Sequence, residues 1–429
     1  MKFTELNIDN FAESIVVLDV DGTLVFDGDL ALSTDTILKI KELSNISKVY
    51  LFSNGDVSRT KKISNDCGVY FLESEYKKPS AKVAESLIIN DEKLFVIGDK
   101  FITDGLFASN IGASFVHVDR IMSGQENFFN KIIYILDSIF GFFIKPFLPF
   151  LHYINLLRPS QWIKNILVFS PIFFAGAFYN LQALQFSSVA FVTFCVASSA
   201  MYILNDIFDR ENDKLHPVKR FRPIASGAVV LREATIMFSL LLLFLIILVS
   251  SVPVMWPAVF FYILLNTSYS LFLKNIPILD IISVAFSYVL RVFLGGEASQ
   301  IYVSPWIIVC VFFGALFLVT GKRLAEFNRK SKRKVLHFYS EKKLKFLLII
   351  SAIATLLSYG FYTIFGSHIP NMVYSTFFVA VALLKVSGVV FLSKKGVEYP
   401  ETLIFKDRVV LMTVGAWVFY VFALLYLNL

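Results

Sequence analysis

The sequence has few charged residues and few cysteines for its length. Only 17% of its 429 residues are charged and 56% are apolar, which is too hydrophobic a balance for an ordinary soluble protein. The cysteines, Cys67, Cys195 and Cys310, lie far apart without metal-type spacing, so we expect isolated core thiols. The chain also lacks the paired half repeats of many transporters. We therefore expect a membrane protein that does not depend on cysteine chemistry.

Charges become scarce only after about residue 130. The start, MKFTELNIDNFAES, has acidic residues and no long apolar core, so we expect no secretory signal and a cytosolic N-terminal domain. We predict a soluble domain at 1–130, a linker at 131–160 and a membrane domain at 161–429. The linker is apolar but interrupted by prolines and basic residues, which favours an amphipathic helix in the membrane interface.

About nine runs in the membrane domain are long enough to cross the hydrocarbon core, which takes roughly 17 to 25 residues. They lie near 163–181, 185–204, 235–252, 254–272, 277–294, 304–320, 345–365, 372–393 and 409–428. Nearly all Lys and Arg of the connecting segments fall in the loops 205–234, 273–276, 321–344 and 394–408. The positive-inside rule therefore predicts a multi-pass protein of the cell membrane, with these loops and the N-terminus in the cytoplasm and the C-terminus outside.

The N-terminal domain alternates strand and helix patterns. SIVVLDVDGTLV is followed by the helical pattern STDTILKIKEL, and strand patterns recur at KVYLFSN, VYFLE and KLFVIGD. This alternation predicts an α/β Rossmann-like domain with a parallel sheet, whose site lies beyond the carboxyl ends of the strands. The polar residues that follow the strands are Asp19, Asp21, Ser53, Asn54, Asp99 and Asp104.

These residues suit phosphoryl transfer. A carboxylate nucleophile must be neutralised by Mg²⁺, a second carboxylate can protonate the leaving oxygen, and a cation must hold the phosphoryl charge. DxDGT at 19–23, Ser53, Lys78 before Pro79 and GDKFITD at 98–104 resemble the haloacid dehalogenase-type (HAD) phosphatases. The short spacing between the motifs leaves no room for a cap domain and is similar to the capless, phosphatidylglycerophosphatase-like branch.

The resemblance implies that Asp19 is the nucleophile and Asp21 the acid and base. It further implies that Mg²⁺ is held by Asp19, Asp99 and Asp104, and phosphate by Ser53, Asn54 and Lys78. Lys77 is an alternative for the role of Lys78 because the two lysines are adjacent. A catalytically inactive domain kept for docking or regulation is the alternative to a working phosphatase.

The membrane domain carries four metal-binding side chains on one side of a predicted helix. On a helix that advances about 100° per residue, Asn205, Asp209, Asp213 and Asp206 fall at about 0°, 40°, 80° and 100°. Carboxylates crowded at the end of a span are costly unless a divalent cation neutralises them. We therefore predict that these four side chains bind Mg²⁺.

This pattern, NDxxDxxxD, resembles the signature of the UbiA superfamily of membrane prenyltransferases, over roughly residues 150–429. The resemblance implies a diphosphate bound through Mg²⁺, with Asp209 and Asp213 among the catalytic residues. Two donors remain open. One is a prenyl diphosphate that alkylates an aromatic acceptor, and the other is 5-phosphoribosyl 1-diphosphate (PRPP), which is attacked by a polyprenyl phosphate.

The second half of the chain favours the phosphoribosyl donor. Aromatic prenyltransferases usually carry a second motif of DxxxD type, whereas this chain has Tyr269, Lys274 and a single acid, Asp280, expected as a metal ligand. Compared with the DxxxD motif, this segment has one acidic residue fewer and one additional cation, Lys274. This difference suits a donor that carries an additional phosphate. Further cations expected to bind phosphate are Lys164, Lys219, Arg220, Arg222, Arg291, Lys322 and Arg323. Arg291 could instead snorkel or pair with Glu297.

The segments RPSQWIKN, HPVKRFRPIASG, YSLFLK, GKRLAE and ETLIFKDRV resemble, in order, the decaprenyl-phosphate phosphoribosyltransferase branch. The resemblance implies a bifunctional enzyme that uses PRPP, polyprenyl phosphate and Mg²⁺ at the bilayer. The N-terminal domain would then remove the 5-phosphate and leave polyprenylphosphoryl-ribose. An aromatic prenyltransferase whose HAD domain has a separate or regulatory role is the alternative. We expect no nucleic-acid partner, and the sequence is compatible with an oligomer.

Overall fold

The chain folds into two compact units. The structure is a computed structural model that describes all residues except 90–91, 123–127, 330–332, 368, 393–406 and 428–429. The first unit comprises Met1–Arg158 and Asp206–Met237, and the second comprises Pro159–Asn205 and Phe238–Leu429. The boundary between the units therefore falls within the NDxxDxxxD pattern. Asn205 belongs to the second unit, whereas Asp206, Asp209, Asp213 and the basic segment that follows belong to the first. Most of ETLIFKDRV and part of the basic run 329–334 lie outside the described residues.

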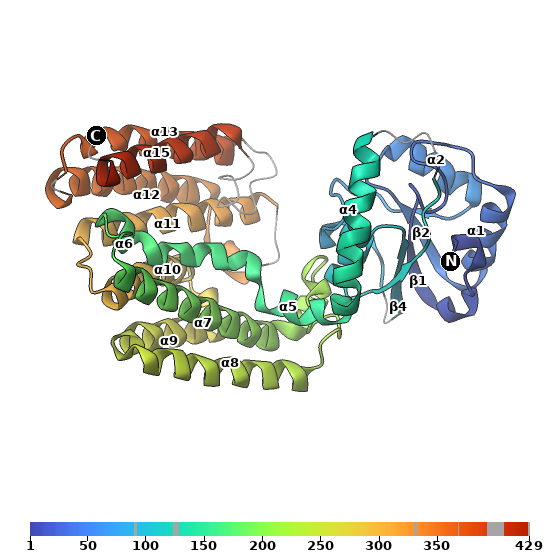
Figure 1. Cartoon of the computed structure of the whole chain (residues 1–429), viewed down its shortest axis with the longest axis horizontal. Helices are drawn as coiled ribbons and strands as arrows, with labels where there is room; N and C mark the ends of the chain where they lie inside the picture. Colours follow the sequence, from blue (N-terminus) through green and yellow to red (C-terminus); the bar gives the residue numbers. More distant parts are fainter. Residues whose placement is uncertain (90–91, 123–127, 330–332, 368, 393–406, 428–429) are drawn as a thin grey trace. The chain divides into compact units, whose positions relative to one another are not determined.

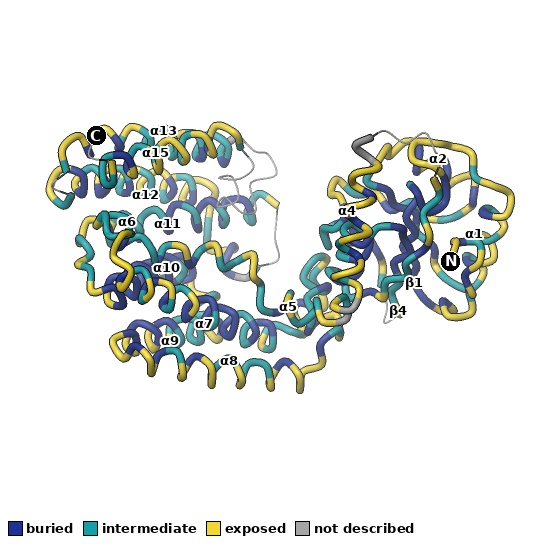
Figure 2. Tube along the Cα trace, in the orientation of Figure 1, coloured by how far each residue is buried: buried dark blue, intermediate teal, exposed yellow. Residues whose placement is uncertain are grey.

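The N-terminal unit is built on a five-stranded parallel sheet with the order β3-β2-β1-β4-β5. The strands are β1 (Ser14–Asp19), β2 (Lys48–Phe52), β3 (Tyr70–Phe71), β4 (Lys93–Gly98) and β5 (Ser114–His117). The first four confirm the predicted strands, whereas β5 was not among them. β1 lies in the middle of the sheet, and all six of its residues are buried. Figure 2 shows β1 within the dark blue, buried part of this unit.

Helices pack around the sheet, and buried side chains from helices and strands form two apolar cores. They are α1 (Thr34–Ile46), α2 (Val57–Cys67), α3 (Leu106–Ile111), α4 (Phe128–Ile144) and α5 (Leu151–Leu157). The Asp56 side chain caps the N-terminus of α2, and Gly68 ends that helix with a φ of +71°. A short π-helical turn, η4 (Phe101–Gly105), follows β4. The carboxyl ends of β1, β2 and β4 therefore meet the loops that carry the polar motifs.

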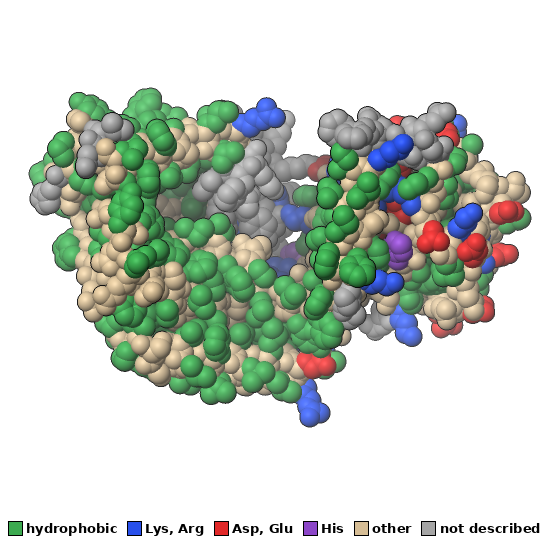
Figure 3. Space-filling view, viewed as in Figure 1, with side chains coloured by type: hydrophobic (Ala, Val, Ile, Leu, Met, Phe, Trp, Pro, Cys, Tyr) green, Lys and Arg blue, Asp and Glu red, His purple; other side chains and the backbone are tan. Residues whose placement is uncertain are grey.

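Eight helices among the described residues are long and apolar enough to cross a membrane. They are α7 (Leu181–Lys214), α8 (Leu231–Ser251), α9 (Trp256–Leu271), α10 (Leu279–Ser299), α11 (Pro305–Asn328), α12 (Glu341–Phe361), α13 (Ser375–Leu392) and α15 (Arg408–Tyr426). Hydrophobic side chains cover much of the visible face of these helices (Figure 3). α10 packs against α9, α11 and the segment η6 (Pro159–Phe169), so its polar residues are enclosed by protein.

The expected first span, at 163–181, is not one of these eight helices. η6 is a 3₁₀ segment, followed by the five-residue helix α6 (Ser170–Phe174). Pro171 has no N–H to donate back along the helix, and the carbonyl of Leu167 instead accepts the hydroxyl of Ser170 at 2.7 Å. The prediction of nine regular spanning helices is corrected to eight in the described part of the chain. The orientation across the membrane stays a prediction.

Candidate functional sites

Three buried carboxylates meet at the carboxyl end of the N-terminal sheet. Asp19 ends β1, Asp99 follows β4 and Asp104 lies in η4, and one oxygen of each lies within 4.8 Å of the others. Thr23 donates a hydrogen bond to Oδ1 of Asp99 at 3.2 Å. Oδ2 of Asp99 is buried and receives no hydrogen bond, although Nη1 of Arg120 forms an ion pair with it at 2.7 Å. Because buried carboxylate oxygens are the ligands Mg²⁺ prefers, this group fits the metal expected from the sequence.

Lys78 neutralises part of this negative charge. Its buried ammonium group donates to both Asp19 and Asp104, whereas Lys77 is exposed. The side chain of Asn54 accepts the backbone N–H of Lys78 at 2.7 Å and donates to its carbonyl at 3.0 Å. Of the two adjacent lysines, Lys78 therefore reaches the acids, and Asn54 holds it in place.

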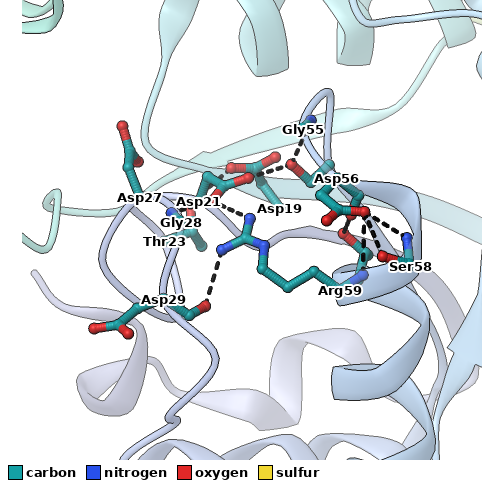
Figure 4. Close-up of polar contacts among 12 residues, drawn as sticks. Asp19, Asp21, Thr23, Asp27, Gly28, Asp29, Gly55, Asp56, Ser58 and Arg59 are labelled. Atoms are coloured by element: carbon teal, nitrogen blue, oxygen red, sulfur yellow. Dashed lines mark hydrogen bonds and ion pairs between the residues drawn. The ribbon is translucent and has the colours of Figure 1, made fainter.

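Asp21 lies near Asp19 in a different environment (Figure 4). It accepts hydrogen bonds from Ser53 and Arg59, and from the N–H of Gly28 at 3.2 Å. Arg59 is also fixed by a hydrogen bond to the carbonyl of Asp29 at 2.9 Å. The sequence reasoning missed Arg59, because no motif marks a helical arginine whose partner is 38 residues away.

These surroundings move the pKa values of the carboxyl groups in opposite directions. Burial, and then the charge of Asp104, raises the pKa of Asp19 to about 8. Burial also raises the pKa of Asp99 to about 6. For Asp21, burial acts upward, but the hydrogen bonds from Ser53 and Arg59 and the charge of Arg59 outweigh it and lower the pKa. The pKa of Asp19 is thus raised, while that of its neighbour Asp21 is lowered.

A cavity of about 300 Å³ opens onto these groups. It is lined by Asp19, Asp21, Asp27, Ser53, Asn54, Gly55, Lys78, Lys100 and Thr103. Five of the seven residues predicted for this site therefore line one cavity, and only Asp99 and Asp104 are not among its lining residues. Lys100 and Thr103 were not singled out in the sequence, although both lie inside the GDKFITD motif. The cavity suits a phosphate ester.

The acids near the end of α7 are paired with arginines. Both oxygens of Asp206 accept from Nη2 of Arg158, at 2.5 and 2.7 Å. Nη1 of Arg222 lies 3.0 Å from Asp206 and 2.6 Å from Asp213. Asp206 and Asp213 are buried and Asp209 is half-buried. Among the described residues, these acids do not form a three-carboxylate group like that of the N-terminal unit. In this structure the two guanidinium groups neutralise these acids, and the binding of Mg²⁺ by the same side chains stays a prediction.

Arg220 differs from its expected role as a phosphate ligand. Its Nη2 donates to the backbone carbonyls of Ala84, at 3.2 Å, and Leu87. The adjacent Phe221 is buried in an apolar core of the N-terminal unit. Arg220 lines neither cavity, whereas Arg222 reaches the acids of α7. The half-buried Lys219 lies on the same segment and also lines neither cavity.

A second cavity, of about 110 Å³, lies within the helical unit. It is lined by Lys164, Tyr269, Val284, Tyr288, Leu318, Val319, Lys322, Arg323 and Arg333. Four of these residues are cations, two carry phenolic hydroxyls and none is acidic. The structure thus brings together four residues predicted as phosphate ligands, Lys164, Tyr269, Lys322 and Arg323, from the three segments η6, α9 and α11. Such a cavity suits an anion with several oxygens.

Arg333 and Tyr288 are the members of this cavity that sequence reasoning missed. Nη2 of Arg333 donates to the hydroxyl of Tyr269 at 2.9 Å, while its buried Nε has no hydrogen-bond partner in the described structure. Arg333 lies in the basic run 329–334, which the positive-inside rule explains without any ligand. Tyr288 lies on an apolar helix, and no motif in the sequence indicates that its side chain lines a cavity.

Asp280 holds one of these cations and has no exposed surface. Its Oδ2 accepts from Nε of Arg323 at 2.7 Å, and its Oδ1 accepts the hydroxyl of Tyr339 at 2.6 Å. Arg323 also donates to Glu326 at 2.8 Å. Both oxygens of Asp280 therefore have protein partners, and one of them fixes the direction of the Arg323 side chain. The expected role of Asp280 as a metal ligand stays a prediction.

The remaining predicted residues lie outside the cavity lining. Nε of the buried Arg291 donates to Asn165 at 2.8 Å, and its Nη1 donates to the carbonyl of Ser287. Asn205 accepts a hydrogen bond from Ser270 at 3.2 Å. Lys274 is half-buried. The geometry therefore makes Arg291 a packing residue of the bundle.

The fold defines a multi-pass membrane protein of helical-bundle type, and it contains a cavity whose four cations suit an anion. Residues 166–399 match the UbiA prenyltransferase family. The chain belongs to this family and is an enzyme of the UbiA superfamily. Residues 1–165 lie outside the matched range.

Known relatives support the assignment. The decaprenyl-phosphate phosphoribosyltransferase of Corynebacterium glutamicum is 32% identical over 289 residues, which cover 64% of this chain and 86% of that protein. The protein of the same name from Mycobacterium tuberculosis is 32% identical, with 62% and 91% covered. The structure of a UbiA homolog from Archaeoglobus fulgidus bound to DMAPP and Mg²⁺ superposes with a TM-score of 0.53 at 17% identity, covering 64% of this chain and 98% of that one. The likeness to this structure concerns the fold alone.

Proposed function

We propose that the helical unit transfers 5-phosphoribose from PRPP to a polyprenyl phosphate. The observation that carries this proposal is the cavity lined by four cations and no acid. A prenyl diphosphate has one charged end and an apolar tail, whereas PRPP and polyprenyl phosphate together bring three phosphate-bearing groups that need several cations. Relatives named decaprenyl-phosphate phosphoribosyltransferase support the same donor and acceptor.

In the proposed transfer, an oxygen of the polyprenyl phosphate attacks C1 of the ribose. The bond from C1 to the diphosphate breaks, and the electron pair leaves with the diphosphate. Arg323, held by Asp280, and Arg333 orient phosphate oxygens in the cavity. Carboxylate and carboxamide oxygens on α7 suit Mg²⁺, which when bound there would neutralise the leaving diphosphate. Arg222 would then be released from Asp206 and Asp213 to bind phosphate.

We propose that the N-terminal unit is a HAD-type phosphatase that removes the 5-phosphate of the transfer product. A carboxylate oxygen of Asp19 attacks phosphorus, the bond from phosphorus to O5 of the ribose breaks, and Asp21, which enters this step in its protonated form, gives its proton to O5. Water, deprotonated by Asp21, then releases inorganic phosphate from Asp19. Lys78 holds the phosphoryl oxygens, and Mg²⁺ at the three carboxylates would neutralise the phosphoryl charge.

Both sites are proposed to face the cytoplasm of the cell that carries this membrane. The basic loops and the N-terminal unit then lie on the same side, in agreement with the positive-inside rule. PRPP is a soluble, highly charged molecule and cannot cross a bilayer. The transfer product is an anchored lipid, so its 5-phosphate stays at the membrane surface where the phosphatase can reach it.

A double-label experiment tests both steps. Membranes containing the protein are incubated with Mg²⁺, polyprenyl phosphate and PRPP that carries ¹⁴C in the ribose and ³²P in the 5-phosphate. Wild type should place ¹⁴C without ³²P in the lipid fraction, whereas Asp19→Asn should place both labels there. Asp35→Asn, an exposed residue of α1, serves as the matched control and should behave as wild type.

The transferase and the phosphatase can each be refuted by a different result of this experiment. Absence of ¹⁴C from lipid in intact wild-type protein would overturn the transferase, and product formed instead from prenyl diphosphate and a hydroxybenzoate would identify an aromatic prenyltransferase. Retention of ³²P in the wild-type lipid would overturn the phosphatase.

A further inference from the structure

The helix α4, which the sequence assigned to a linker, has two chemically different faces. On a helix of about 100° per residue, Tyr134, Asp137 and Gly141 share one side, and all three are buried in the N-terminal unit. The other faces carry exposed apolar side chains. These are Ile132, Ile133, Ile135, Leu136, Ile139, Phe142 and Phe143, each 38% to 79% exposed. Figure 3 shows hydrophobic side chains along the visible face of α4.

The buried face reaches the turn that carries Asp104. The two oxygens of Asp137 accept the N–H groups of Phe101, at 3.0 Å, and Ile102, at 2.8 Å. These are the first N–H groups of the turn η4 and have no partners inside it. A Cβ at Gly141 would lie 2.2 Å from the ring of Phe101, so only glycine lets that ring lie against the helix. α4 therefore fixes the start of η4 at two points.

The same face also reaches Asp99. The ring of Tyr134 lies 3.2 Å from the guanidinium carbon of Arg120. Arg120 in turn forms the ion pair with Asp99 at 2.7 Å. Two of the three clustered carboxylates are thus held through residues of α4.

The bilayer is the partner that the exposed face fits. The N-terminal unit itself contains the last residues of α7 and the first residues of α8, both long and apolar enough to span a membrane. Within this unit, Tyr153 of α5 donates to Glu233 of α8 at 2.9 Å. The bilayer surface therefore borders the unit that carries α4. A row of seven exposed aliphatic and aromatic side chains is costly in water and stable at a lipid interface.

We propose that α4 seats in the membrane interface and that Asp137 is the positioning residue through which it sets the turn bearing Asp104. The site is then fully formed only when α4 lies on lipid. The inference rests on the proposed phosphatase, because its activity readout is phosphate release. It adds to that function a lipid dependence that acts through α4.

Two readouts on full-length protein in nanodiscs test the role of Asp137. Asp137→Asn should raise the Mg²⁺ concentration for half-maximal phosphate release by about tenfold, as expected when a group that orients a metal ligand is altered. In metal-free protein, the amide hydrogens of peptide 99–106 should exchange faster than in wild type. Ser138→Ala, on the same helix and exposed, is the matched control and should change neither value. Unchanged exchange and unchanged Mg²⁺ dependence in Asp137→Asn would refute the positioning role.

A separate experiment tests the membrane seat. An environment-sensitive dye on Ile139→Cys should emit at shorter wavelength than the same dye on Lys61→Cys of α2, and brominated lipid should quench it selectively. Replacing Ile139 and Phe143 by Asn should raise the Mg²⁺ concentration for half-maximal phosphate release in nanodiscs, as Asp137→Asn does, and should thereby lower activity at limiting Mg²⁺. Equal emission at both positions, or full activity of the doubly substituted protein, would refute lipid as the partner. A wild-type protein that releases no phosphate at all would instead overturn the proposed function.

Discussion

The substitution Asp280→Asn distinguishes between two alternative roles of Asp280, the acid in the first turn of α10: metal ligand or partner of Arg323. As a metal ligand, Asp280 should set the requirement for Mg²⁺; as the partner of Arg323, it should set the affinity for the phosphate-bearing donor. Asn retains an oxygen that can accept from Arg323 but loses the charge. A hydrogen bond between charged groups contributes about 1.5–3 kcal/mol and a neutral one about 0.5–1.5 kcal/mol. The difference of about 1–2 kcal/mol corresponds to a factor of about 5–30.

The assay measures initial rates of ribose transfer in nanodiscs. We expect the KM for PRPP to rise about 5- to 30-fold in Asp280→Asn, with the half-saturating Mg²⁺ concentration unchanged. Both partners are buried, so Asp280→Ala, which removes one of the two carboxylates paired with Arg323, should also destabilise the bundle by about 3–5 kcal/mol in thermal unfolding. Glu297→Gln, an exposed acid on the same helix, is the control. A raised Mg²⁺ requirement at unchanged KM would show that our reasoning on Asp280 is wrong.

Three further predictions concern the N-terminal unit. Arg59→Ala removes a donor that lowers the pKa of Asp21, so the pH profile of phosphate release should move to higher pH. The shift should be smaller in Arg59→Lys. The same pH profile in wild type and Arg59→Ala would contradict the role of Arg59. Burial and a neighbouring carboxylate raise the pKa of Asp19 to about 8, so Mg²⁺ must displace a proton below that pH. Calorimetry should therefore find that the affinity of the site for Mg²⁺ rises from about pH 6 to 8 and levels off above about pH 8. An affinity for Mg²⁺ that does not depend on pH would contradict the assignment. Phe221→Ala should destabilise the unit by about 3–5 kcal/mol, measured by thermal unfolding, whereas the exposed Phe208→Ala should have little effect.

The sequence predicted most of the N-terminal sheet and its candidate site. Asp19, Ser53 and Asp99 follow strands, and parallel strands bring their carboxyl ends to one edge, so their proximity follows from strand order alone. Arg59 and Arg120 could not be found in this way. Each pairs with a carboxylate on another element, and that pairing depends on the direction of a side chain in three dimensions.

In the membrane half, the spanning helices were predictable because only a long apolar run can cross the hydrocarbon core. The exception is the segment 163–181, which is apolar enough but forms a 3₁₀ segment up to Phe169 and then only the five-residue helix α6. The cations were also predictable as a group. Their separate roles were not: Arg323 lines the cavity, Arg291 packs in the bundle, and Arg220 holds backbone carbonyls.

By itself, the sequence determined the membrane class, the parallel sheet and the set of acids and cations from which the sites are built. These features depend on composition and on periodicity along the chain, which are local properties. Only the tertiary structure decided that Lys78 rather than Lys77 reaches the acids, that Asp280 holds Arg323, and that α4 supports η4. The reason is that a buried charge takes its role from the partner that neutralises it, and folding brings that partner from a distant part of the chain.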